Sequence, residues 1–209
     1  MVFHYIDGTV GNLPFMKTLI LICILFISKF SLSQEAEKKY TFKEVGWTLI
    51  IPADFKVLDS TENALMVEQG LKVIGETNEM KAGPSKTRYL ISATKNATNY
   101  FGSTITVFGN VKDSTYKVFN QSVNDLLYNS FLGINPDAII DTFSTEDKID
   151  GLTFAKFHLI VSVDTYTIFN LFLLSKHYMG YALSISYLYS DDKTKEQIEA
   201  MLRNSKFTK

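Results

Sequence analysis

Three polar side chains interrupt segments whose other residues are typical of β-strands. Lys156 and His158 lie two positions apart in the segment 152–163, so both point to the same face if this segment is a strand. Asn170 interrupts the segment 166–175 in the same way. A polar group in such a setting either forms a hydrogen bond with a neighbouring group, which is the more common case, or contacts a ligand. These three residues are therefore the candidate binding residues.

Carboxylates form the second group of residues that could do chemistry. Asp141, Glu146, Asp147 and Asp150 concentrate negative charge around one expected hairpin. Such oxygen ligands can hold calcium, although the spacing is not that of an EF-hand loop. A hydrated turn explains the same residues, and the sequence does not decide between the two. Asp141 or Asp164 could also serve a hydrolase, but isolated acids at turns and strand ends occur in most soluble domains.

Motifs of common enzymes and metal sites are absent from the sequence. It has no HExxH, GxSxG or GxGxxG. Gly70–Gly75 has the glycine spacing of a phosphate-binding loop, but Glu76 stands where the lysine is required. The one cysteine, Cys23, lies in a hydrophobic run, and spacing suggests no third ligand for the two histidines beyond it, His158 and His177. We therefore expect no metal and no cofactor, and binding rather than catalysis.

The hydrophobic run near the N-terminus predicts export. Leu19–Ile27 follows Lys17 and precedes small residues that end at Ser33. A positive charge, a short apolar core and small residues are the three regions of a secretory signal peptide. The run is shorter than the roughly 20 apolar residues that cross a bilayer. We expect cleavage after Ser33, a periplasmic or secreted product and no stable membrane insertion after cleavage; Met16 is an alternative initiator, in which case residues 1–15 are not translated.

The composition of the exported chain is that of one globular domain. The whole sequence is 46% hydrophobic and 21% charged, which is typical of folded rather than disordered chains. The segment 1–33 contains two lysines and one aspartate, so the remainder carries 19 basic and 21 acidic residues. This balance, with no clustered basic face, argues against binding of nucleic acid. We assign residues 34–39 to a flexible leader and residues 40–209 to a single domain.

Patterns of hydrophobicity predict a mixed α+β fold. A capping box, Asp59 to Glu62, begins a helix that extends to about Gly75. A longer helix begins at Asp113, and Asp191 or Asp192 caps a final helix with Ile198, Met201 and Leu202 on its inner side. Expected strands, rich in aromatic and β-branched residues, cover 40–44, 47–51, 88–93, 103–108, 138–143, 152–163, 166–175 and 181–188. Both faces of 166–175 are mostly apolar, so this strand is expected to be central and covered on both sides. The fold class is therefore an antiparallel β-sheet with helices on both faces.

Short segments near both ends resemble a known family. The residues Gly46–Pro52 (GWTLIIP), Asp150–Phe154 (DGLTF), Tyr181–Tyr187 (YALSISY) and Ser205–Phe207 (SKF) are similar to those of Mog1/PsbP-like domains, the DcrB-like group included. The middle of the chain is matched only by the order of its elements. The resemblance implies an α/β/α sandwich whose members, bacterial envelope proteins among them, act mainly by binding. It supplies no catalytic motif to transfer.

These observations lead to one main hypothesis and two alternatives. The main hypothesis is a non-enzymatic envelope or periplasmic protein that binds a protein or small ligand through one face of the sheet, with Lys156, His158, Asn170 and the loop 96–100 as candidate positions. The first alternative is the carboxylate hydrolase. The second is a carrier of small apolar ligands, suggested by the 22 phenylalanine and tyrosine residues that follow residue 33. A deep polar pocket favours the enzyme, an elongated dry cavity the carrier, and an exposed apolar patch the binding module.

Overall fold

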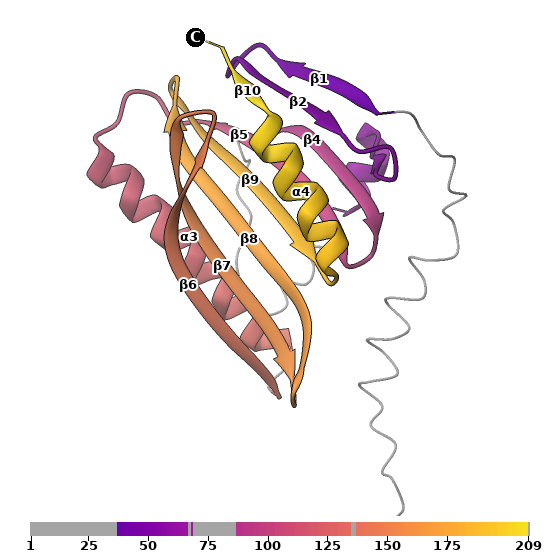
Figure 1. Ribbon diagram of the computed structural model, residues 1–209. Coiled ribbons are helices and arrows are strands. Elements are labelled where there is room, and N and C mark those ends of the chain that lie inside the picture. Colours follow the sequence, from indigo (N-terminus) through magenta and orange to yellow (C-terminus); the bar gives the residue numbers. More distant parts are fainter. Residues whose placement is uncertain (1–36, 67, 69–86, 135–136, 209) are drawn as a thin grey trace, which may run out of the picture. The chain divides into compact units, whose positions relative to one another are not determined.

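A computed structural model of the chain describes residues 37–66, 68, 87–134 and 137–208, all within the unit Leu32–Lys209. Its elements (Figure 1) are β1 (Lys38–Phe42), β2 (Trp47–Ile51), β3 (Lys56–Val57), β4 (Thr87–Asn96), β5 (Asn99–Val107), α3 (Asp113–Ile134), β6 (Ala138–Ile149), β7 (Leu152–Val163), β8 (Tyr166–Tyr178), β9 (Tyr181–Tyr189), α4 (Asp192–Asn204) and β10 (Lys206–Phe207).

The described strands form two antiparallel sheets. The larger, 7-stranded sheet has the order β3-β4-β5-β9-β8-β7-β6, and the smaller, 3-stranded sheet has the order β1-β2-β10. Strands β6 to β9 are consecutive in the chain and adjacent in the sheet, so they form an antiparallel meander. Asp150 and Asp164 take positive φ values in the turns before and after β7, a conformation that aspartate tolerates better than most residues.

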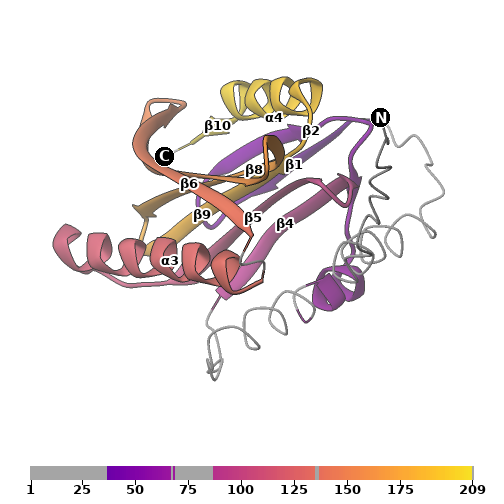
Figure 2. The same cartoon turned by 90° about the horizontal axis from the view of Figure 1, so that it is seen from below.

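The larger sheet lies between two helical layers, as Figure 2 shows with α4 on one side and α3 on the other. Phe172 and Leu174 of β8 share a core with Ile198 and Leu202 of α4. Leu173, which points to the opposite face, packs in a second core that includes Val123, Leu127 and Phe131 of α3. The predicted fold class is confirmed, and the arrangement is the sandwich that the resemblance to Mog1/PsbP-like domains implies.

Helix α4 follows the sequence prediction closely. Its cap is Asp191, whose carboxylate accepts a hydrogen bond from the backbone N–H of Thr194 at 2.8 Å. The predicted inner residues Ile198, Met201 and Leu202 are buried. Asn99 fixes this end of the helix to the β4–β5 hairpin, because its Nδ2 donates to Asp191 at 3.0 Å.

Helix α3 differs from its prediction at two points. Asp113 lies in the first turn rather than at the cap, and the carbonyl of Lys112 accepts the bond from the backbone N–H of Tyr116. The buried positions also include two polar residues, Asn124 and Ser130. Ser130 can be buried because its hydroxyl donates to the carbonyl of Leu126 in the preceding turn.

Several strand predictions need correction. Lys38 and Lys39, assigned to the leader 34–39, pair with Ile51 and Ile50 and belong to β1. Strand β6 continues to Ile149 instead of ending at residue 143, because the polar segment that follows residue 143 pairs with β7 throughout. The strand predicted over 166–175 is covered on both sides only towards its end, since residues 166–168 are exposed. In β6, pairing with β7 has outweighed the low strand preference of the charged residues 146–148.

The capping box at Asp59 is confirmed. Oδ1 of Asp59 accepts from the backbone N–H groups of Thr61 and Glu62, each at 2.8 Å, and Glu62 accepts from the N–H of Asp59 at 3.1 Å. Residues 60–66 are helical. The rest of this predicted helix, with the glycine-spaced segment 70–75, lies outside the described residues.

Candidate functional site

The three candidate residues all lie on one face of the larger sheet, towards the β6 edge. His158 pairs with Phe143 of β6 and Phe172 of β8, and Ile160 pairs with Asn170. Paired residues point to the same face, so the even-numbered residues of β7 mark it. This is the face that α4 covers over β9, whereas in Figure 1 no helix lies in front of β6 and β7.

We call this region the open face. Its apolar side chains are unusually accessible for a sheet in a sandwich, since Ile139 is 53% exposed and Phe143 is 54% exposed. The residues that the strand register places on it are Ile139, Asp141 and Phe143 of β6, Lys156, His158, Ile160 and Ser162 of β7, and Asn170 and Phe172 of β8.

His158 and Asn170 are in direct contact. Nε2 of His158 lies 3.0 Å from Oδ1 of Asn170, so a proton on Nε2 is donated to the amide oxygen. Both candidates therefore have a neighbour as hydrogen-bond partner. Among the described residues, the hydrogen bond of the His158 ring goes to this amide and not to a hydroxyl or a carboxylate.

An aromatic series runs across the sheet through His158. Its ring stacks on Phe172 with centroids 3.9 Å apart, and Phe172 stacks in turn on Tyr187 at 4.8 Å. On the other side, Phe143 lies 5.9 Å from the His158 ring at an angle of 37°. The series leads from the buried core at Tyr187 to the half-exposed ring of Phe143. It fixes the ring of His158 between two neighbours and supports Phe143 from one side.

Lys156 is engaged by two neighbours. Its ammonium group lies 3.1 Å from a carboxylate oxygen of Asp147 and 5.0 Å above the ring of Phe172. The second contact has cation–π geometry. Lys156 thus borders the aromatic series and carries a charge that Asp147 balances.

The open face disfavours a charged imidazole. Burial lowers the pKa of His158, the positive charges of Lys156 and Lys195 lower it further, and the contact with Asn170 acts in the opposite direction. At neutral pH the ring is therefore uncharged, and the surface between Phe143 and Phe172 has mainly apolar character.

The lowered pKa of His158 predicts a pH dependence of stability. An unfolded chain has a histidine pKa of about 6.5, so the unfolded state binds the proton first as the pH falls. Stability should decrease as the pH falls through about 6.5 and level off below the folded pKa of His158. The free energy of unfolding in urea is measured for wild type and His158→Gln between about pH 8 and about pH 5. Because both proteins contain the same titrating carboxylates, the difference between the two pH profiles reports the titration of His158. Identical pH profiles for the two would contradict the prediction.

The carboxylates named in the sequence do not gather. Asp147 pairs with Lys156, and Asp150 accepts bonds from Lys206 and from the backbone N–H of Phe207. Asp141 is exposed on β6 and Asp164 is exposed in the turn after β7. Within the described ranges no group of three or more histidine, cysteine, aspartate or glutamate side chains could hold a metal ion.

The predicted loop 96–100 is a tight turn with a structural role, because Asn96 ends β4 and β5, expected to start at residue 103, begins at Asn99. Asn99 is buried and bonds to Asp191 and to the backbone N–H of Ser190. Asn96 accepts from the backbone N–H of Thr98 within the turn. Asn99 therefore joins the hairpin to the start of α4, and Asn96 stabilises the turn itself.

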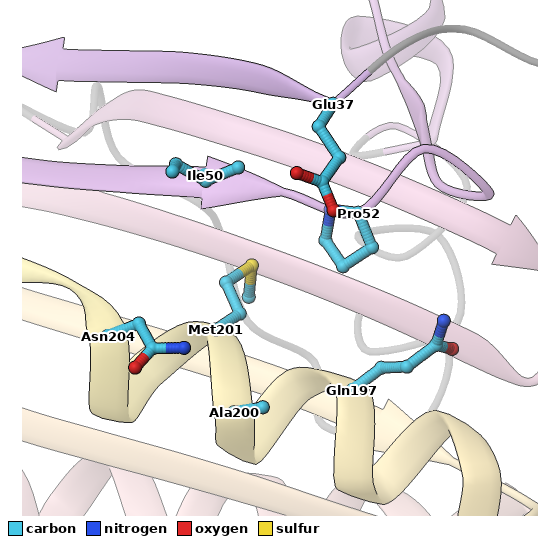
Figure 3. A pocket seen from close by; sticks show the side chains of 7 residues that line it. All are labelled: Glu37, Ile50, Pro52, Gln197, Ala200, Met201 and Asn204. Atoms are coloured by element: carbon cyan, nitrogen blue, oxygen red, sulfur yellow. The ribbon is translucent and has the colours of Figure 1, made fainter.

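One shallow recess lies apart from the open face, between β2 and α4 (Figure 3). It has a volume of about 310 Å³ and is lined by Glu37, Ile50, Pro52, Gln197, Ala200, Met201 and Asn204. Gln197 already bonds to Asp54. This volume is at the lower end of the range for small-molecule sites, and none of the candidate residues lines it.

The sequence did not reveal Phe143 as part of the site. Phe143 stood at the end of a predicted strand, and only its pairing with His158 places it on the open face. The alternation of Ile139, Asp141 and Phe143 was the available signal, because residues two apart share a face.

No family model and no curated protein matches the chain. Solved structures with a similar fold include the solution structure of cyanobacterial PsbP (CyanoP) from Synechocystis sp. PCC 6803. It is 11% identical, with a TM-score of 0.49, and the alignment covers 87% of this chain and 98% of that chain. A protein of Bacteroides thetaiotaomicron VPI-5482 is also 11% identical, with a TM-score of 0.42. The alignment covers 84% of this chain and 49% of the other, so this chain spans about half its length. No activity or partner is transferred from either protein.

No helix in the described part of the chain is both long and apolar enough to cross a membrane.

Proposed function

We propose that this protein is an exported, non-catalytic binding module that recognises another protein of the cell envelope through the open face. The observation that carries the proposal is the pair of half-exposed apolar side chains, Ile139 and Phe143, beside the stacked ring of His158. Exposed apolar groups with a polar border are typical of protein-binding surfaces.

The shape and chemistry of the open face favour a protein over a small ligand. Its side chains are spread along three strands, and the recess lined by the described residues lies elsewhere. His158 is held by stacking on Phe172, and Phe143 leans on His158 in a tilted contact, so a partner would lose little entropy in ordering them. Lys156 and Asp147 provide a charged border.

Binding rather than catalysis is supported by the surroundings of His158. A general base needs a nucleophile or a water within reach and commonly a third group that orients it. Here the His158 ring bonds to an amide and stacks on Phe172. Asp141 and Asp164, the carboxylates of the hydrolase alternative, do not line the recess.

Export is the part of the proposal that rests on sequence alone. The run Leu19–Ile27 with Lys17 before it and Ser33 after it is the basis for a periplasmic or secreted location. A partner is accordingly sought in the envelope fraction.

Affinity capture with matched variants tests the proposed function. The protein is immobilised, a captured envelope protein is purified, and its Kd is measured for wild type, Ile139→Glu, Phe143→Glu and Val118→Glu. A glutamate in the centre of a desolvated apolar contact should weaken binding by tenfold or more. Val118 is the control, because it is 68% exposed on α3, the helix that packs on the opposite face of the sheet.

Two results would contradict the proposal. One is a captured protein that binds the Ile139 and Phe143 variants as tightly as it binds wild type. The other is the absence of any stoichiometric envelope partner for the wild-type protein.

A further inference from the structure

Strand β6 forms a long edge of the larger sheet. It is last in the strand order and spans the 12 residues Ala138–Ile149. Its register with β7 runs from Ala138–Val163 to Ile149–Leu152 without a shift. Among the described strands β7 is its one neighbour, and residues 141–146 are all exposed. Figure 1 shows the outer side of β6 at the border of the sheet.

The outer side of such an edge presents backbone N–H and C=O groups with which no described neighbouring strand pairs. Natural edge strands are usually short, bulged, interrupted by proline or rich in charge, which prevents pairing with other chains. The opposite edge of the same sheet is β3, with two residues. In β6 there is no bulge, proline or glycine, and its four charged residues, Asp141, Glu146, Asp147 and Lys148, lie on either side of an uncharged centre, Thr142–Thr145. What fits such an edge is another extended strand.

We infer that a second copy of this chain pairs with β6, strand to strand and antiparallel, about a twofold axis that passes beside Phe143 perpendicular to the sheet. An axis in this direction leaves the open faces of both copies on the same side of the combined sheet. Two residues that lie opposite each other must then point to the same face, so their numbers differ by an even amount. Phe143 then lies opposite Phe143 of the second copy, and Thr142 lies opposite Ser144. The result is one continuous sheet across two chains.

Charge and packing select this register. With the axis at Phe143, two aromatic rings meet on the open face and Asp141 lies opposite an uncharged threonine. Moving the axis to Ser144 places Asp141 opposite Asp147, and like charges directly opposite destabilise a strand pair. Moving it to Thr142 places Phe143 opposite Asp141. The register centred on Phe143 is therefore the one of these three in which an aromatic pair forms and acids stay apart.

The inference does not depend on the proposed partner of the open face. Thr142 and Ser144 pair with Leu159 and Phe157 of β7, which belong to the core under α3. Their side chains therefore point away from the open face. Substitutions at these two positions can block the edge and leave Ile139, Phe143 and His158 unchanged.

Complementary charge variants test the second copy. The double variants Thr142→Lys/Ser144→Lys and Thr142→Glu/Ser144→Glu each place like charges opposite one another in the inferred pair. Sedimentation velocity over a concentration series should show a dimer for the wild-type protein, and at least a tenfold loss of dimer affinity for each double variant. An equal mixture of the two should restore a dimer of mixed composition, because lysine then lies opposite glutamate. Circular dichroism checks that each variant is folded.

Two outcomes would overturn the inference. The first is a wild-type protein that stays monomeric throughout the series; if an envelope partner then fails to bind the double lysine variant, the edge pairs with a different chain. The second is a dimer that both double variants form as well as wild type does. If Ile139→Glu no longer binds the envelope partner but still forms the dimer, the open face binds the partner and β6 pairs with the second copy, as both proposals state.

Discussion

Replacing Trp47 by alanine is expected to lower the free energy of unfolding by about 3–5 kcal/mol. The side chain is fully buried in β2, stacked on Phe207 with centroids 5.6 Å apart and packed against Phe42 at 5.8 Å. Removing it leaves a cavity where the smaller sheet meets the core shared with α4. Equilibrium unfolding in guanidinium chloride, followed by circular dichroism, measures the loss.

Ile50 provides the matched control in the same strand. It is 48% exposed, so Ile50→Ala removes apolar atoms that are already largely in water and should cost less than about 1 kcal/mol. Comparable losses in the two variants would mean that strand preference, and not the buried contact with Phe207, determines the effect at Trp47.

The faces of the long strand could be predicted from sequence. The odd-numbered residues of 152–163 are nearly all apolar, and Phe157, Leu159 and Val161 indeed pack in the core that α3 shares. The even-numbered face is mixed, and it is the face that stays open. Alternation with a period of two carries this information because side chains of a strand point to the two faces in turn. Helical spacing, with apolar residues three and four apart, identified the inner side of α4 in the same way.

The contact between His158 and Asn170 could not be predicted, because it depends on a bulge. Counting back from the turn at Val163 and Tyr166 would place His158 opposite residue 171 and Asn170 opposite Leu159, on the other face. An irregularity between Val161 and Ser162 shifts the register by one residue, and a shift of one moves a side chain to the other face. His158 thereby comes opposite Phe172 and beside Asn170. No local pattern in the sequence marks the bulge.

The length of β6 escaped prediction for a different reason. Ser144 to Lys148 are polar, and Glu146, Asp147 and Lys148 are of types depleted in strands, so the expected strand ended at residue 143. Their conformation is set by pairing with β7, which is rich in aromatic and β-branched residues. The edge on which the inferred dimer depends is thus a property of the pair of strands.

Gly46→Ala should destabilise the protein by about 2–5 kcal/mol, through backbone strain and steric overlap together. Gly46 has a φ of 58°, and a Cβ placed there would lie 2.0 Å from the carbonyl oxygen of Thr208. Thr208 cannot easily withdraw, because its N–H donates to the carbonyl of Gly46 at 2.8 Å. Alanine should therefore push β10 away from β2 and unstack Phe207 from Trp47, the one tryptophan of the chain.

Gly109→Ala separates the two causes of this loss. Gly109 also has a positive φ, 69°, but nothing lies within 4 Å of a Cβ built there, so this variant should show the backbone strain alone, about 1–2 kcal/mol. Guanidinium unfolding of both variants gives the difference, and a red shift of tryptophan emission in Gly46→Ala alone reports the separation of Phe207 from Trp47. Equal losses of stability with no change in emission would mean that the carbonyl of Thr208 does not limit the space at Gly46. The position of β10 would then be set by Asp150, which accepts bonds from Lys206 and Phe207.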